Sequence, residues 1–219
     1  MGDYTFLHQL NIVVHIITGT TALLMGLVAL LSKKGGRVHK RSGLVFLVLI
    51  TLVIATALMG VFAFGANEFL IALTMLSGYQ AFSGYRVLKS KSNKPKPLDI
   101  LVAFLTLSSG LYFLYYLDAI GMIWSPVIIY STVGALFIMI AYDFLRYLIK
   151  AERYRNIWLY EHIYKMIAAF TALLAAFIGT VLPQYHPYSQ FLPSIFGTLL
   201  AIGSILYFRR KRTLTKNRP

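Results

Sequence analysis

The chain has 219 residues, of which 58% are hydrophobic and only 13% are charged, and this composition excludes an ordinary soluble domain. It contains no cysteine, which excludes disulfides, thiolate metal ligands and cysteine nucleophiles. A net charge of +14 would favour nucleic-acid binding in a soluble protein, but the basic residues here separate long apolar runs, so nucleic acid is not inferred as a partner. The composition predicts a protein that is embedded in a lipid bilayer.

Runs of about 20 residues with few charges are long enough to cross ~30 Å of hydrocarbon as helices. Seven such runs follow one another, at residues 6–32, 43–66, 69–88, 98–117, 120–142, 160–182 and 191–208. They predict an all-α fold, an integral membrane bundle of seven transmembrane helices. The bundle forms a single domain, residues 1–208, and a basic cytoplasmic tail follows it at residues 209–219.

The basic residues give this bundle an orientation. The turn at residues 32–43, SKKGGRVHKRSG, is the first of four basic segments, and the others follow the third, fifth and seventh runs. The charged residues of the opposite connections are all acidic: Asp3, Glu68 and Asp118. Because short loops rich in lysine and arginine stay in the cytoplasm, we expect the amino terminus outside and the carboxyl terminus inside. The same basic residues favour attraction to anionic lipid head groups at the inner face.

The first run carries a polar stripe that lipid does not require. His8, Asn11, His15 and Thr18 recur at steps of three and four residues, which places them on one face of a helix. Such a stripe either packs against another helix through hydrogen bonds or lines a site in the outer half of the bundle. His15 and Asn11 are therefore candidate ligand-binding residues.

The inner ends of the second, third and fifth runs supply further candidate ligand-binding residues. His39 precedes the second run, and the third run ends in SGYQAFSGYR, which includes Tyr79 and Arg86. The fifth run closes with Asp143 and Arg146, whose spacing of three predicts an ion pair on one helix. The topology brings all of these residues toward the cytoplasmic face.

The sixth run predicts a helix packed inside the bundle. One seam of the helix, spaced by three and four residues, holds mostly small side chains: His162, Lys165, Ala169, Ala172, Ala176 and Gly179. Small residues let membrane helices approach closely, so this seam is expected to face a neighbouring helix. That packing aims His162 into the bundle at its inner end.

Short motifs give the chain a resemblance to a known family. They are H-x3-G from His15 to Gly19, HKRSG at the start of the second run, GYR at the end of the third, and His162 at the start of the sixth. The chain resembles an uncharacterised family of predicted bacterial multipass proteins, a domain of unknown function. The resemblance implies a location in the bacterial plasma (inner) membrane and no established activity, so it assigns no catalytic residue.

The functional prediction is an accessory or ligand-binding membrane subunit, with a polar group of His39, Asp143, His162 and Arg86 at the cytoplasmic end of the bundle. Its partners would be the lipid bilayer and either another membrane protein or further copies of itself. A zinc-dependent hydrolase is one alternative. His39, His162, Asp143 and Glu161 offer two imidazoles and two carboxylates at one membrane level, which suits a Zn²⁺ site acting on lipid at the inner leaflet.

An electron-transfer protein is the second alternative. Transmembrane cytochromes of the b type, to which the chain bears a weak likeness, hold heme b between histidines at matching depth on two helices. His39 and His162 satisfy this condition at the inner boundary. No other helix carries a histidine at the depth of His15, so an outer heme is not predicted. Zinc and heme b are thus the two cofactors that the sequence leaves open.

Overall fold

The structure is a computed structural model that describes residues 2–65, 69–121, 125–155 and 157–216. All regular elements in these ranges are helical, which confirms the all-α class. They are α1 (Gly2–Leu31), α2 (Arg37–Phe64), α3 (Phe69–Ser90), α4 (Pro97–Ile120), α5 (Pro126–Leu145), the 3-10 helix η1 (Arg146–Leu148), α6 (Ala151–Tyr154), α7 (Trp158–Val181), the 3-10 helix η2 (Pro183–Tyr185) and α8 (Tyr188–Lys216).

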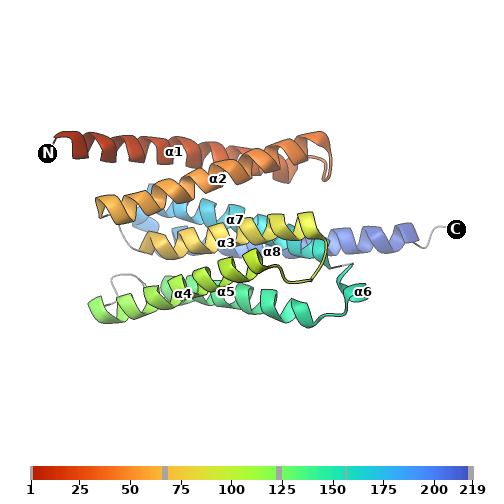
Figure 1. Cartoon of the computed structure of the whole chain (residues 1–219). Helices are drawn as coiled ribbons and strands as arrows, with labels where there is room; N and C mark the ends of the chain where they lie inside the picture. The colour runs from red at the N-terminus through yellow and green to blue at the C-terminus, as the bar shows by residue number, and fades with distance from the viewer. Residues whose placement is uncertain (1, 66–68, 122–124, 156, 217–219) are drawn as a thin grey trace.

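The long helices run up and down in a bundle whose two chain ends lie at opposite sides (Figure 1). The α1–α2 turn, the α3–α4 loop, α6 and the end of α8 share one side, which we call the basic end because the lysine- and arginine-rich segments lie there. The amino terminus lies at the other side, which we call the amino-terminal end. This arrangement brings the four predicted basic segments together.

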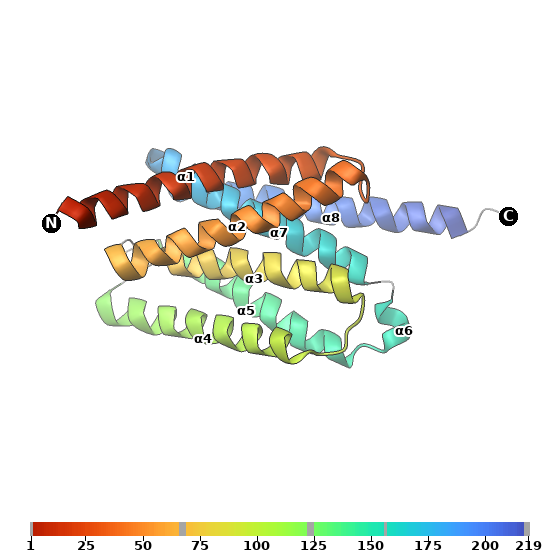
Figure 2. The same ribbon diagram turned by 45° about the horizontal axis from the view of Figure 1, so that its top comes forward.

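Six of the described helices, α1, α2, α4, α5, α7 and α8, are long and apolar enough to cross a membrane, as expected of a multipass membrane protein. Helix α3 is long but more polar, so the predicted seventh crossing remains a prediction. Its polarity has a physical reason: α3 lies between α2 and α4 in both views (Figures 1 and 2) and also packs against α5 and α7. Side chains that face protein need not be apolar, and Ser77, Gln80 and Ser83 of α3 are buried.

Helix α2 begins earlier than the sequence predicts. Its expected start was residue 43, but the helix starts at Arg37, directly after Gly35 and Gly36. Gly35 has a φ of +76°, a left-handed conformation that favours glycine, and it allows the chain to reverse between α1 and α2. The basic turn is therefore short, and His39 lies in the first turn of α2. The basic tail likewise continues α8 as helix to Lys216.

Helices α1, α2, α3 and α7 form a four-helix group that positions the candidate site. Helix α1 packs against α2 and α7, and α3 also packs against α2 and α7, so α2 and α7 face each other across the group. A layer of buried apolar side chains crosses its middle, and it includes Ala22, Phe46, Ile50, Val53, Ala81, Ala169, Phe170 and Leu173. Helices α4 and α5 pack on the far side of α3, and α8 packs on α7.

Candidate functional site: two cavities in one four-helix group

Two cavities lie within the four-helix group, on either side of its apolar layer. The inner cavity, toward the basic end, has a volume of about 260 Å³ and is lined by His39, His162, Phe46 and Phe170 among others. The outer cavity, toward the amino-terminal end, has a volume of about 180 Å³ and includes His15 and Asn11 in its lining. Each of the four helices contributes to both cavities. The predicted histidines of α1, α2 and α7 therefore line cavities and are not enclosed in closely packed side chains.

The two histidines of the inner cavity come from helices that face each other across the group. His39 lies at the start of α2 and His162 near the start of α7, and both are half-buried. Most of the remaining lining is apolar, and Leu44 and Leu88 are exposed at its edge. The sequence prediction that His39 and His162 meet at one depth is consistent with this shared cavity.

Each of the two imidazole rings is held by a hydrogen bond from its own Nδ1 atom. His39 Nδ1 lies 2.9 Å from the carbonyl oxygen of Ala29, and His162 Nδ1 lies 3.1 Å from that of Gly84. A carbonyl oxygen only accepts, so each Nδ1 must carry the proton. In the neutral ring the lone pair is then on Nε2. Histidines that bind metals are oriented in this way, with one nitrogen donating to a carbonyl and the other free to coordinate.

Local backbone features explain why these two carbonyls are available. Ala29 lies in the last turn of α1, where carbonyl groups have no partner within the helix, so His39 supplies one of the missing donors. Gly84 lies where α3 and α7 approach closely. A Cβ atom at this position would lie 3.0 Å from Lys165 Cβ and 3.2 Å from Met166 Sδ. The absence of a side chain therefore lets the Gly84 carbonyl come within reach of His162.

A separate buried ionic network lies beside this cavity, where α5 and α7 meet. Lys165 forms an ion pair with Asp143, and Arg146 Nη1 lies 2.8 Å from Glu161 Oε2. The predicted ion pair of Asp143 and Arg146 is also present, between the last turn of α5 and the start of η1, because Arg146 Nε lies 3.5 Å from Asp143 Oδ1. All four side chains are buried, and their two positive and two negative charges balance. Burying charges that are paired in this way costs much less free energy than burying isolated charges.

Three tyrosines complete the hydrogen bonds of the two carboxylates. Tyr79 donates to Asp143 at 2.8 Å, while Tyr142 and Tyr154 donate to Glu161 at 2.6 and 3.0 Å. Tyr79 was a predicted candidate, and the structure places it in this network rather than in the inner cavity. Tyr154 was missed, because α6 lies in a connection that carried no apolar pattern. Tyr154 lies outside the predicted runs, and burial raises its pKa above the usual tyrosine value.

The four residues of the zinc hypothesis fall into two groups. His39 and His162 border the inner cavity, whereas Asp143 and Glu161 belong to the ionic network. Glu161 and His162 are neighbours on α7, so their side chains leave the helix about 100° apart and reach different helices. Across the ranges that the structure describes, no three His, Asp or Glu side chains lie close enough together to hold a metal ion.

Arg86 also pairs away from the histidines. Its Nε lies 2.6 Å from Asp99 Oδ1, and Nη2 lies 3.3 Å from Oδ2. This two-point contact joins the end of α3 to the start of α4 at the basic end. Arg86, predicted as a ligand-binding residue, therefore neutralises a carboxylate that the sequence placed at the start of the fourth run.

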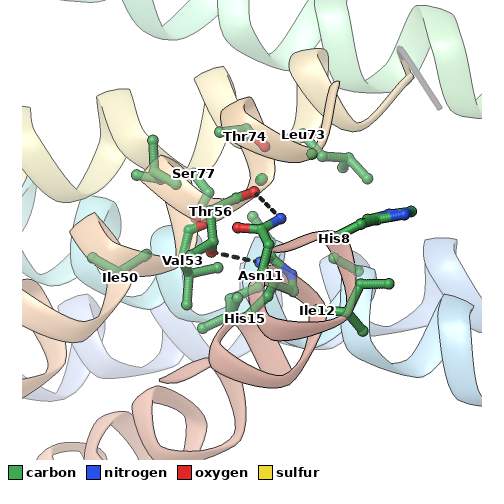
Figure 3. Close-up of a pocket in the computed structure, with 16 residues that line it drawn as sticks. His8, Asn11, Ile12, His15, Ile50, Val53, Thr56, Leu73, Thr74 and Ser77 are labelled. Carbon is green, nitrogen blue, oxygen red and sulfur yellow. Dashed lines mark hydrogen bonds between the residues drawn. The ribbon is translucent and has the colours of Figure 1, made fainter. Parts of the chain in front are cut away.

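The outer cavity receives the polar stripe of α1 (Figure 3). Asn11 Nδ2 donates to the Thr56 carbonyl oxygen at 3.1 Å, and His15 Nδ1 lies 2.9 Å from Thr56 Oγ1. His8 stacks on Phe64 with ring centroids 4.8 Å apart. Asn11 and His15 therefore pack against α2 through hydrogen bonds and also line a cavity, while ligand binding there stays a prediction.

Comparisons with known proteins do not extend these observations: no family model, no curated protein and no solved structure matches the chain.

Proposed function

We propose that the protein is a ligand-binding membrane subunit that transfers electrons through a heme b held in the inner cavity by His39 and His162. The observation that carries this proposal is the shared geometry of the two rings. Both border one apolar cavity, both come from facing helices, and both have Nδ1 engaged by a backbone carbonyl oxygen, which leaves Nε2 to coordinate when the ring is neutral. His39 and His162 would together hold the heme b, and the chemistry that the group would supply there is one-electron transfer.

The apolar lining of the cavity suits one part of a macrocycle that carries charged groups at its edge, and a space of about 260 Å³ would enclose only that part. Phe46 and Phe170 line the cavity. A Cβ atom at Gly26 would lie 2.5 Å from the Phe170 ring, so the absence of a side chain at Gly26 lets this ring lie against α1. Lys40 and Tyr85 stand at the edge nearest the basic end, where they would pair with carboxylates of the macrocycle. The exposed Leu44 and Leu88 mark the side through which a flat ring would project toward lipid.

The topology and location are part of the same proposal. We propose that seven helices, α3 included, cross the plasma (inner) membrane of a bacterium, with the amino terminus outside and the carboxyl terminus cytoplasmic. The gathering of the basic segments at one end supports this orientation, since such segments stay in the cytoplasm and attract anionic lipid head groups. Membership of the uncharacterised bacterial family named above remains a proposal. An electron carrier needs a donor and an acceptor, so we expect a membrane partner.

The test is the heme content of the purified full-length protein, produced in cells supplied with a heme precursor. We expect one heme b per chain and the absorption spectrum of low-spin, bis-histidine iron. His39→Ala and His162→Ala should each remove it. His15→Ala serves as the matched control, because this histidine borders the outer cavity and should leave the heme content unchanged.

Loss of heme through misfolding must be told apart from loss of a ligand. His162→Gly should recover the low-spin spectrum when imidazole is added, because free imidazole can enter the space that the side chain left. A misfolded protein would not respond. Wild-type protein that contains no heme and takes up none when hemin is added would overturn the proposal. The simpler role of an accessory subunit, whose histidines serve only packing, would then stand.

A further inference from the structure

We infer that the outer cavity binds the hydroquinone ring of a lipid-soluble quinol, whose hydroxyl group donates a hydrogen bond to His15 Nε2. This inference concerns a different cavity from the proposed heme site and does not depend on it. The cavity lies among α1, α2, α3 and α7, with polar side chains of α1 and α2 on one side and Thr74 and Ser77 of α3 on another (Figure 3).

The protonation state of His15 follows from its partner. The Thr56 hydroxyl lies 2.9 Å from the carbonyl oxygens of both Leu52 and Val53, and its single proton is directed to them. Thr56 Oγ1 can therefore only accept from His15, which puts the imidazole proton on Nδ1. The lone pair on His15 Nε2 remains for a donor in the cavity.

A second acceptor lies on the facing helix. Ser77 of α3 borders the cavity, and its hydroxyl proton is directed to the carbonyl oxygen of Ala169, 3.4 Å away. The oxygen lone pairs of Ser77 are thus left to accept. The lining also contains the polar side chains of His8, Asn11, Thr56 and Thr74. The two acceptors, His15 Nε2 and Ser77 Oγ, favour a ligand that donates. A quinol has two hydroxyl donors, whereas the corresponding quinone has carbonyl oxygens that only accept.

The size of the cavity selects a single ring. An apolar cavity of about 150 Å³ engineered in another protein binds benzene. The outer cavity, at about 180 Å³, matches one substituted six-membered ring. Ile12 is exposed at its edge, where an isoprenoid tail would leave toward lipid. An apolar tail and a small ring with hydroxyl donors together describe a membrane quinol.

The test measures binding of three matched ligands to the wild-type protein in detergent, by calorimetry without oxygen. The ligands are tetramethylhydroquinone, the corresponding quinone and the dimethyl ether of the hydroquinone. We expect the hydroquinone to bind about fivefold more tightly than either of the others, which is the effect of one hydrogen bond. Because this comparison needs no variant, it does not depend on how a substitution affects folding.

Two variants then assign the preference to one residue. His15→Phe should abolish the preference, whereas His8→Phe should retain it, because His8 borders the same cavity but stacks on Phe64. Equal binding of all three ligands, no binding at all, or a preference that survives in His15→Phe would each overturn the inference. Heme content measured in the same samples separates this result from the inner cavity, since neither variant touches His39 or His162.

Discussion

His162 of α7 donates its Nδ1 proton to the carbonyl oxygen of Gly84 on α3, 3.1 Å away, and this contact between two helices fixes the direction of the imidazole ring. The two residues are 78 positions apart in the chain. The bond exists only because α3 and α7 pack closely at a glycine. Changes that separate α3 from α7 should therefore alter the orientation of the His162 ring.

Gly84→Ala should destabilise the protein and reduce its heme content. The new Cβ would lie 3.0 Å from Lys165 Cβ, so the helices must move apart, at a cost of about 1–3 kcal/mol for overpacking. Thermal unfolding in detergent and the heme spectrum are the measurements. Gly134→Ala is the matched control, because a Cβ there meets no atom within 4 Å. The thermal unfolding midpoint of this variant should not fall. Equal effects of both changes would contradict the packing argument.

Asp143→Asn should destabilise the protein strongly. The substitution removes the nearest counter-charge of the buried Lys165, whose other carboxylate neighbour, Glu161, lies 3.9 Å away, and breaking a buried pair costs about 3–5 kcal/mol. The double variant Asp143→Asn with Lys165→Met should recover much of this loss, because it removes both charges. The comparison variant is Glu152→Gln at the exposed surface, which should leave the unfolding midpoint unchanged. A double variant no more stable than the single one would show that the pair is not the cause.

Stability should fall above about pH 10, and Tyr154→Phe should weaken this dependence. Burial raises the pKa of Tyr154, so the folded protein holds the phenol proton at a pH where the unfolded chain releases it. The unfolded state then binds fewer protons, and the free energy of unfolding decreases as pH rises. Unfolding midpoints at pH 8 and pH 11 measure the effect. Tyr188→Phe, at an exposed tyrosine, should leave the dependence as it is in the wild type.

The crossing of α3 can be tested with reporter fusions. A periplasmic reporter joined after Gly65 should be active, and a cytoplasmic fluorescent reporter joined after Asn93 should fluoresce, because these positions flank α3. Reporter activity in intact cells is the measurement. A fluorescent reporter joined after Lys216 provides the orientation control and should also fluoresce. If the positions before and after α3 report the same side, α3 does not cross the membrane.

The helices themselves were predictable, because length and apolar composition are local properties of the chain. All seven predicted runs correspond to long helices, and the basic segments were grouped correctly by counting charges. One error in a boundary, at the start of α2, arose because the prediction counted apolar residues. Helix α2 instead begins at a glycine turn, six positions before its apolar run.

The site was predictable only in part, because which side chains meet depends on helix packing. The sequence placed His39 and His162 at one depth, but it could not show that Glu161, the neighbour of His162, points to a different helix. Spacing revealed the pair of Asp143 and Arg146, which are three positions apart in the chain. It did not reveal Tyr154, whose contacts with Arg146 and Glu161 come from the fold of the α5–α7 connection.

The central place of α3 bears on how the bundle is made. This helix is less apolar than its neighbours, and its polar side chains are covered by α2, α4, α5 and α7. During synthesis α2 already exists when α3 emerges, whereas α7 follows after about 70 more residues. The Gly84 face of α3 therefore has no partner until α7 has been made. Assembly of the histidine cavity becomes a late event, which takes place only when α7 has been inserted.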